Sequence, residues 1–161
     1  MTIIASMAST TVNALELQGG DQAIVASSSD DNGIDAVLNG WIDYNSSIKQ
    51  GGLVFNKYKS PDSKGKKYVI LSHIDEDKKL QDTLDIPRDI TDGNENYIVI
   101  AIEDEAFKGN TSIKHVNIDA NIKSFGKSIF ENCTSLESVN MDNDMSNNIE
   151  KLGEDMFKGC N

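Results

Sequence analysis

The 161-residue sequence contains little of what many chemical sites are built from: two cysteines, two histidines and one tryptophan. So few cysteines and histidines leave little material for a zinc site. Basic residues are also scarce, 15 against 26 acidic ones, which gives a formal charge of −11. A protein that grips nucleic acid or an anionic membrane needs a basic surface, so we expect neither partner. No apolar run approaches the about 18 residues that a membrane-spanning helix requires.

The charge is unevenly distributed along the chain. Residues 1–48 contain six acidic residues and no lysine or arginine, so this part carries −6 and the remainder carries −5. One basic cluster surrounds Asp62, and its members are Lys57, Lys59, Lys64, Lys66 and Lys67. Such a cluster is interpreted either as the solvated tip of a hairpin or as a basic docking patch.

The beginning of the chain has features of a targeting segment. Residues 1–14 are small and mildly apolar, and Val12-Asn13-Ala14 resembles a signal-peptidase site. The basic residues with which an export signal normally begins are missing. We therefore expect residues 1–14 to be either a truncated signal or a flexible leader, and residues 15–33 to be a polar linker.

Residues 34–80 are predicted to form an N-terminal cap of one helix and one hairpin. The helix is indicated by apolar residues on one face, namely Ile34, Val37, Leu38, Trp41 and Ile42. We expect Trp41 to anchor this helix to the next element rather than to stack on a ligand. The hairpin is indicated by two β-rich runs, 53–59 and 66–71, around the turn sequence SPDSKG. Its packing face is expected to contain Phe55, Tyr58, Tyr68 and Ile70.

The last third of the chain repeats itself. Eight positions recur after 23 residues, and seven of the eight pairs are apolar in both copies. The first copy runs from Val99 to Ile118 and the second from Ile122 to Met141. A third copy starts at Ile149 with an offset of 27 residues, and Leu84-x-Ile86 matches the strand of an earlier, incomplete copy.

A period of about 20–30 residues is typical of leucine-rich repeats, in which every turn contributes a short strand. One such turn cannot enclose a core alone, so successive turns must stack. Val116 and Ile118 are then predicted to lie beside Val139 and Met141. Phe107, Phe130 and Phe157 are predicted to form an aromatic spine inside.

The repeats resemble those of the BspA-like leucine-rich repeat family. The resemblance rests on IAIEDEAFKGNTSIKHVNI, IKSFGKSIFENCTSLESVNM and IEKLGEDMFKGCN, which follow the pattern I-x-x-I-G-x-x-A-F-x-x-C-x-x-L-x-x-V-x-I-P. The sequence departs from this pattern at Asn110, which replaces a cysteine, and at Phe125, which replaces an aliphatic residue. No Leu-x-x-Val-x-Ile strand follows Cys160, so we expect an array that is incomplete at its C-terminus.

The expected fold class is therefore an α+β repeat protein. Residues 81–161 are predicted to form a leucine-rich repeat solenoid with short parallel strands and short convex helical or turn segments, preceded by the cap. The resemblance implies similarity to bacterial and protist surface proteins that bind host or partner-cell macromolecules. A secreted or cell-surface location and a surface or matrix protein as partner are expectations of that resemblance.

Several residues invite a chemical role and also have a simpler explanation. Cys133 and Cys160 occupy equivalent repeat positions, so they are either a disulfide pair or buried free thiols that fill a tight corner. Residues 30–35 and 142–148 contain closely spaced oxygen ligands, but neither has the complete calcium-loop pattern. His73 and His115 are expected at the surface, and we expect no cofactor and no resident metal.

The open face of the repeat strands is the candidate binding site. Alternation along each strand places every second side chain on the side away from the core. These side chains are Thr83, Asp85, His115, Asn117, Asp119, Ser138, Asn140 and Asp142. They are predicted to form three columns across neighbouring turns, on a polar and mildly acidic sheet.

The sequence thus favours a non-enzymatic recognition or adhesion module that binds a macromolecule through this face. The alternative is a structural spacer or stalk within a larger surface protein, without binding of its own. No constellation of acid, base and nucleophile and no nucleotide-binding or protease motif occurs in the sequence.

Overall fold

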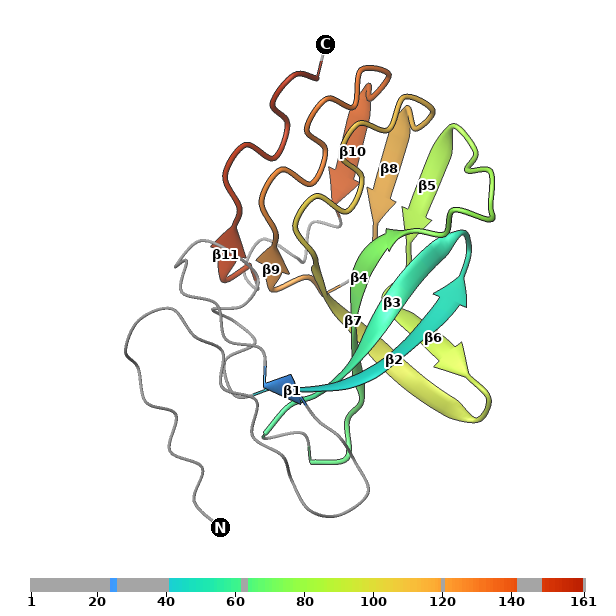
Figure 1. Cartoon of the computed structure of the whole chain (residues 1–161), viewed down its shortest axis with the longest axis vertical. Helices are drawn as coiled ribbons and strands as arrows, with labels where there is room; N and C mark the ends of the chain where they lie inside the picture. The colour runs from blue at the N-terminus through green and yellow to red at the C-terminus, as the bar shows by residue number, and fades with distance from the viewer. Residues whose placement is uncertain (1–23, 26–40, 62–63, 120, 142–148, 161) are drawn as a thin grey trace.

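A computed structural model of the chain describes residues 24–25, 41–61, 64–119, 121–141 and 149–160. The described residues form strands and turns, and no helix is found among them. The strands make two sheets, one of eight strands and one of three, which Figure 1 shows side by side. Both sheets cover one continuous apolar core.

The predicted hairpin is confirmed. It is formed by β3 (Leu53–Lys59) and β4 (Tyr68–Ile74), which pair antiparallel, and β2 (Ile42–Gln50) pairs with the other edge of β3. The first residues of β2 also pair with the short β1 (Ile24–Val25). The other edge of β4 pairs in parallel with β7 (Glu95–Ile102). The first half of β7 also pairs with β6 (Asp89–Asp92). The hairpin is therefore joined directly to the repeats by main-chain hydrogen bonds.

The predicted helix is wrong at its C-terminal end, and residues 34–40 lie outside the described residues. Ile42 is the first residue of β2 and faces Lys59 of β3. Pairing with the hairpin thus overrides the helical spacing of the apolar residues, since tertiary contacts outweigh local propensity. Trp41 packs against Tyr68, with 5.0 Å between the ring centroids, which agrees with its expected role as an anchor to the next element.

The expected packing face of the hairpin is also wrong, because its four residues divide between two clusters. Phe55 packs with Val69 and Leu71 in the main core. Tyr58, Tyr68 and Ile70 lie in a second, smaller cluster with Ile100 and Ala101. Alternation along a strand sends odd and even positions to opposite faces of the sheet, and here each face carries buried apolar residues.

The repeats stack through two parallel ladders. The first contains β5 (Thr83–Ile86), β8 (His115–Ile118) and β10 (Ser138–Met141), all in register. The second contains the end of β7, β9 (Ser124–Phe125) and β11 (Lys151–Leu152). The pairing of β5 with β8 confirms that Leu84-x-Ile86 is the strand of an earlier copy. The second ladder was not predicted from the sequence, because two of its strands, β9 and β11, are only two residues long.

The aromatic spine is confirmed. Phe107 and Phe130 stack with 5.2 Å between their centroids, and Phe130 and Phe157 stack at 5.6 Å. The first two rings are buried, and Phe157 is 46% exposed. The spine therefore fills the space between the two ladders from one turn to the next.

The segments on the convex side are turns in the described residues, so the helical half of the α+β prediction is unconfirmed. Equivalent positions adopt the same left-handed backbone, with φ between 53° and 60° at Glu105, Ser128 and Asp155. A second left-handed position is occupied by Gly109, Asn132 and Gly159. Asn132 is compatible with this position because asparagine enters the left-handed region more readily than other residues with a Cβ.

Main-chain hydrogen bonds connect each of these turns to the next one. Phe107 N donates to Ile129 O at 3.0 Å, and the equivalent Phe130 N donates to Met156 O at 2.9 Å. The same pattern joins Glu105 to Lys127 and Ser128 to Glu154. Because each turn satisfies the polar groups of its neighbour, the stack behaves as one continuous unit.

The two cysteines are free thiols that close the corner of each turn. Cys133 Sγ donates to Phe107 O at 3.0 Å, and Cys160 Sγ donates to Phe130 O at 3.1 Å. The first copy has Asn110 in place of cysteine, and its side-chain oxygen accepts from the backbone N–H groups of Ser112 and Ile113. The corner thus requires a small side chain that can make a hydrogen bond.

We expect iodoacetamide at pH 8 to modify Cys160 at least tenfold faster than Cys133. Cys133 is fully buried, and burial raises the pKa of its thiol, so both access and thiolate are reduced. Cys160 lies in the last described turn and is only partly buried. Peptide mass spectrometry over a time course measures the two rates, and unfolding in urea should make them equal. Equal rates in the native protein would contradict the buried corner.

Candidate functional site

The predicted open face is present as a sheet of three parallel strands. Thr83 faces His115, which faces Ser138, and Asp85 faces Asn117, which faces Asn140. Leu84, Val116 and Ile118 between them are buried in the core. The structure therefore brings six of the eight predicted site residues into two straight rows, in the register that the repeat predicts.

Both rows are connected by side-chain hydrogen bonds across the strands. Asn140 Nδ2 donates to Asn117 Oδ1 at 3.0 Å, and Asn117 Nδ2 donates to Asp85 Oδ1 at 2.7 Å. In the other row, His115 Nδ1 and Ser138 Oγ lie 3.0 Å apart. Five of the six side chains in the two rows are thus hydrogen-bonded to a neighbour, which lowers the entropy that a partner would have to remove on binding.

The third row is only partly described. Asp119 is exposed just after β8, and its backbone N–H donates to Ile86 O at 2.9 Å. Arg88 Nε donates to the carbonyl of Asp119 at 3.4 Å, so an arginine lies beside this row. Asp142 lies outside the described residues. The acidic loops at 30–35 and 142–148, considered above for calcium, also lie outside them.

The rim of the face contains charged residues that sequence reasoning missed. Lys114 Nζ lies 3.3 Å from Asp82, and His115 Nε2 lies 3.8 Å from Glu137. His115 is the first residue of β8 and was predicted, whereas Asp82, Lys114 and Glu137 precede the strands, in segments that carry no alternating pattern. The signal that could have found Lys114 and Glu137 is that they occupy equivalent positions of the repeat, 23 residues apart.

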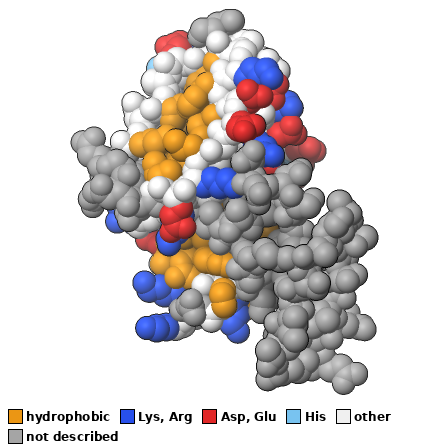
Figure 2. Space-filling model, turned by 90° about the vertical axis from the view of Figure 1, so that its left-hand side faces the viewer, with side chains coloured by type: hydrophobic (Ala, Val, Ile, Leu, Met, Phe, Trp, Pro, Cys, Tyr) orange, Lys and Arg blue, Asp and Glu red, His pale blue; other side chains and the backbone are white. Residues whose placement is uncertain are grey.

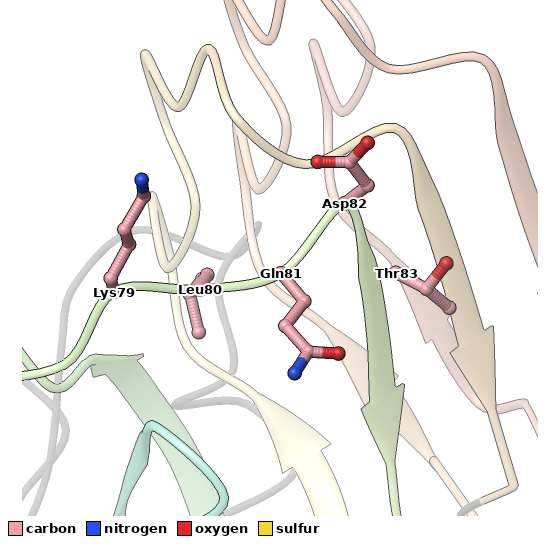
Figure 3. A pocket seen from close by; sticks show the side chains of 5 residues that line it. All are labelled: Lys79, Leu80, Gln81, Asp82 and Thr83. Atoms are coloured by element: carbon pink, nitrogen blue, oxygen red, sulfur yellow. The ribbon is translucent and has the colours of Figure 1, made fainter.

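A hollow of about 490 Å³ adjoins the first strand of the face. It is lined by Lys79, Leu80, Gln81, Asp82 and Thr83, which form the segment leading into β5 (Figure 3). Figure 3 shows Thr83 on β5 beside β8, where it continues the row that His115 begins. The hollow thus extends the polar face beyond the edge of its first strand.

An apolar strip lies on another side of the molecule, the side at which β11 is found. Figure 2 shows this strip, and the exposed large apolar side chains at the end of the stack are Met141 of the second copy and Leu152 and Phe157 of the third. They occupy core positions of the repeat, where the corresponding Ile118, Phe125 and Phe130 are buried by the following turn. The two surfaces therefore differ in chemistry, since the strand face is polar and the end of the stack is apolar.

The described residues contain no group of three or more histidine, cysteine, aspartate or glutamate side chains arranged to hold a metal ion. Among the same residues, no helix has the length and hydropathy needed to cross a membrane. What the strand face offers is hydrogen-bond donors and acceptors, one imidazole and carboxylates along a rigid sheet. This set can recognise a surface by hydrogen bonds and charge.

Stacked turns, two parallel ladders and an internal aromatic spine define the chain, from residue 83 onward, as a leucine-rich repeat solenoid. Residues 89–161 match the family described as BspA type leucine rich repeat region (6 copies). The repeats of this chain are therefore similar to BspA-type leucine-rich repeats over this range. The resemblance seen in the sequence is thereby confirmed.

Three solved structures of bacterial leucine-rich proteins are similar to this chain, and the first of them supports the same fold. A leucine-rich repeat protein from Bacteroides capillosus is 27% identical, with a TM-score of 0.51, and the match covers 61% of this chain and 67% of that one. A leucine rich cell surface protein from Faecalibacterium prausnitzii is 22% identical, with a TM-score of 0.49, over 62% of this chain and 24% of that one. A leucine-rich repeat protein from Bacteroides ovatus is 18% identical, with a TM-score of 0.45, over 70% of this chain and 33% of that one.

The chain thus spans 24% and 33% of the second and third of these proteins. Among curated proteins, no sequence matches it.

Proposed function

We propose that the chain is a non-enzymatic recognition or adhesion module that binds a surface or matrix protein through the strand face. The observation that carries the proposal is the hydrogen-bonded ladder Asp85–Asn117–Asn140 on three strands in register. A preorganised polar sheet of this kind binds without a large ordering cost. The family of the repeats supports a secreted or cell-surface location, since the resemblance is to surface proteins.

The chemistry of the face indicates what such a partner must offer. Asp85 and Asp119 carry negative charge, and Asn117, Asn140 and Ser138 supply neutral donors and acceptors. A partner with lysine or arginine side chains spaced to meet the acidic positions would complement it. Charge complementarity of this kind mainly raises the rate of association and the specificity.

A structural spacer is the second candidate, and it is supported by the uniform stacking of the turns. Backbone hydrogen bonds between equivalent residues, such as Phe107 N to Ile129 O and Phe130 N to Met156 O, give a rigid rod-like unit. A spacer needs no complementary partner. It therefore predicts that the purified chain has no measurable affinity for any surface protein.

The two candidates are separated by a binding screen followed by a double substitution. A panel of purified extracellular-matrix and cell-surface proteins is first tested against the immobilised chain. For a protein that binds, we expect Asn117→Lys with Asn140→Lys to raise the dissociation constant at least tenfold, which is a loss of about 1.4 kcal/mol in binding free energy. Lysine at both positions breaks the ladder and introduces two positive charges on an acidic face.

The matched control is Thr111→Lys with Thr134→Lys. These threonines are exposed, lie at equivalent repeat positions and are outside the strand face. Surface plasmon resonance should show unchanged binding for the control. The free energy of unfolding of the Asn117→Lys/Asn140→Lys variant should fall by less than about 1 kcal/mol, because its lost hydrogen bonds are exposed. Equal weakening by both pairs would place the binding site elsewhere, and no binding by any panel protein would favour the spacer.

A further inference from the structure

A second pocket lies in the N-terminal cap, among the strands that precede the repeats. It has a volume of about 470 Å³ and is lined by residues of β2, β3, β7 and the segment just before β4. Its lining residues are Tyr44, Ser46, Lys57, Tyr58, Lys59, Gly65, Lys66, Lys67 and Tyr97. In Figure 1 the end of β3 and the start of β4 lie at the lower end of the molecule, away from β8 and β10. The pocket is therefore separate from the strand face.

A β-bulge in β2 builds one wall of this pocket. Asp43 pairs with Tyr58 and Ser47 pairs with Asn56, so three residues of β2 face a single residue of β3. Within the bulge, Asn45 has a left-handed backbone with φ of 49°. A bulge bends its strand and redirects its side chains. Here the two residues beside Asn45, Tyr44 and Ser46, both line the pocket.

The pocket is positively charged in a protein whose net charge is −11. Lys57 Nζ lies 2.7 Å from Asp92, and Lys67 forms an ion pair with Glu95. Each of these hydrogen bonds raises the pKa of its lysine, so both ammonium groups stay charged near neutral pH. Lys59 and Lys66 are exposed and form no ion pair with any described residue. These two lysines give the lining its net positive charge.

One aromatic ring holds two of the lysines in place. The ring of Tyr97 is buried, and its centroid lies 5.3 Å from Lys57 Nζ and 5.9 Å from Lys67 Nζ. Cation–π contacts of this kind fix the positions of charged groups. Tyr44 is 40% exposed and lines the same pocket, so an aromatic side chain is available there. Fixed charge, an exposed aromatic side chain and the hydroxyl of Ser46 are thus gathered in one cavity.

We propose that this pocket binds an acidic saccharide unit, a hexuronic or sialic acid, with the carboxylate at Lys59 and Lys66 and the sugar ring against Tyr44. Lysine ammonium groups bind carboxylates as point charges. The volume is that of a small-molecule site. A cavity lined by tyrosine and serine hydroxyls can pair with the hydroxyl groups that surround a sugar ring.

An extended acidic peptide fits the same surface less well. Peptides that bind to a sheet usually add as a strand along a regular edge. The bulge between Asp43 and Ser47 interrupts the regular geometry of β2 at the pocket. A compact ligand that enters the cavity requires no regular edge.

The test is a titration of the full chain with glucuronic acid and with N-acetylneuraminic acid, observed by ligand NMR. Glucose serves as the neutral sugar and inorganic phosphate as the simple anion. We expect at least one sugar acid to bind saturably, with glucose and phosphate at least tenfold weaker. Lys59→Gln with Lys66→Gln should weaken binding of that sugar acid at least tenfold. Tyr44→Ala should weaken it several-fold.

The matched control is Lys108→Gln with Lys158→Gln, which removes the same charge from two exposed lysines that line neither this pocket nor the strand face. Circular dichroism should show that all variants remain folded, because the substituted lysines are exposed. The proposal is overturned if neither sugar acid binds, if phosphate binds as tightly as they do, or if both lysine pairs weaken binding equally. Retained binding in Asn117→Lys/Asn140→Lys would show that this site is independent of the strand face. Loss of sugar binding in that variant would place the sugar on the face instead.

Discussion

Replacing Phe130 by alanine is expected to lower the free energy of unfolding by about 3–5 kcal/mol. Phe130 is 1% exposed and is sandwiched between Phe107 and Phe157. Alanine would leave a cavity between two rings that are held apart by the backbone hydrogen bonds of their own turns. Because those hydrogen bonds limit collapse of the cavity, the loss should be at the level of a fully buried aromatic residue.

Phe157→Ala is the matched control for this prediction. It removes the same side chain from the equivalent position of the next turn, where the ring is 46% exposed and has one stacking partner. We expect a loss of only about 1–2 kcal/mol, since less apolar surface leaves the core. Urea unfolding followed by circular dichroism measures both. A loss below about 1 kcal/mol for Phe130→Ala, or equal losses for both variants, would contradict the aromatic spine as the centre of the core.

The repeat region could be predicted closely because its information is local and recurs. The offset of 23 residues between Val116 and Val139 is the same offset that places them side by side in β8 and β10. Once the period is known, stacking fixes the register, and the register fixes which side chains share a row. For this reason six residues of the candidate face could be placed from the sequence alone.

The N-terminal cap could not be predicted to the same degree, because its contacts are not local. The apolar spacing of Ile34 to Ile42 is helical, yet Ile42 pairs with Lys59 and lies in a strand. Nothing near Ile42 in the sequence indicates that partner. The same reason hides the cap pocket, which joins Tyr44 to Tyr97 across residues that are far apart in the chain. The lysine cluster was visible in the sequence, but the bulge that opens the cavity beside it was not.

The hydrogen bonds within the candidate face are a third case. Alternation predicts that Asp85, Asn117 and Asn140 point to the same side, but it does not predict that they bind one another. The bonds arise because parallel strands in register place the side chains at equivalent positions within hydrogen-bonding distance of one another. A regular repeat therefore predicts the positions of these groups, whereas their pairing depends on which side chains occupy the row.

Replacing Gly126 by alanine is expected to lower the free energy of unfolding by about 3 kcal/mol, the upper end for an overpacked core. A Cβ atom at this position would lie 2.4 Å from the backbone N of Asp104 and 2.6 Å from the carbonyl carbon of Glu103. Both atoms belong to the preceding turn, so no side chain can move aside. Separating the turns would break the bond from Gly126 N to Ile102 O, which is 2.9 Å long.

The equivalent Gly153 repeats this arrangement one turn later, where a Cβ would lie 2.1 Å from Gly126 O. Close approach of successive backbones thus explains why glycine stands at this position of the repeat. The control is Gly93→Ala, which has a left-handed backbone with φ of 61° and open space around it. Its cost should be about 1 kcal/mol, from backbone strain alone. If urea unfolding shows the same loss for Gly126→Ala as for Gly93→Ala, the turns are not in contact there, and the stacking of the solenoid must be looser than its hydrogen bonds indicate.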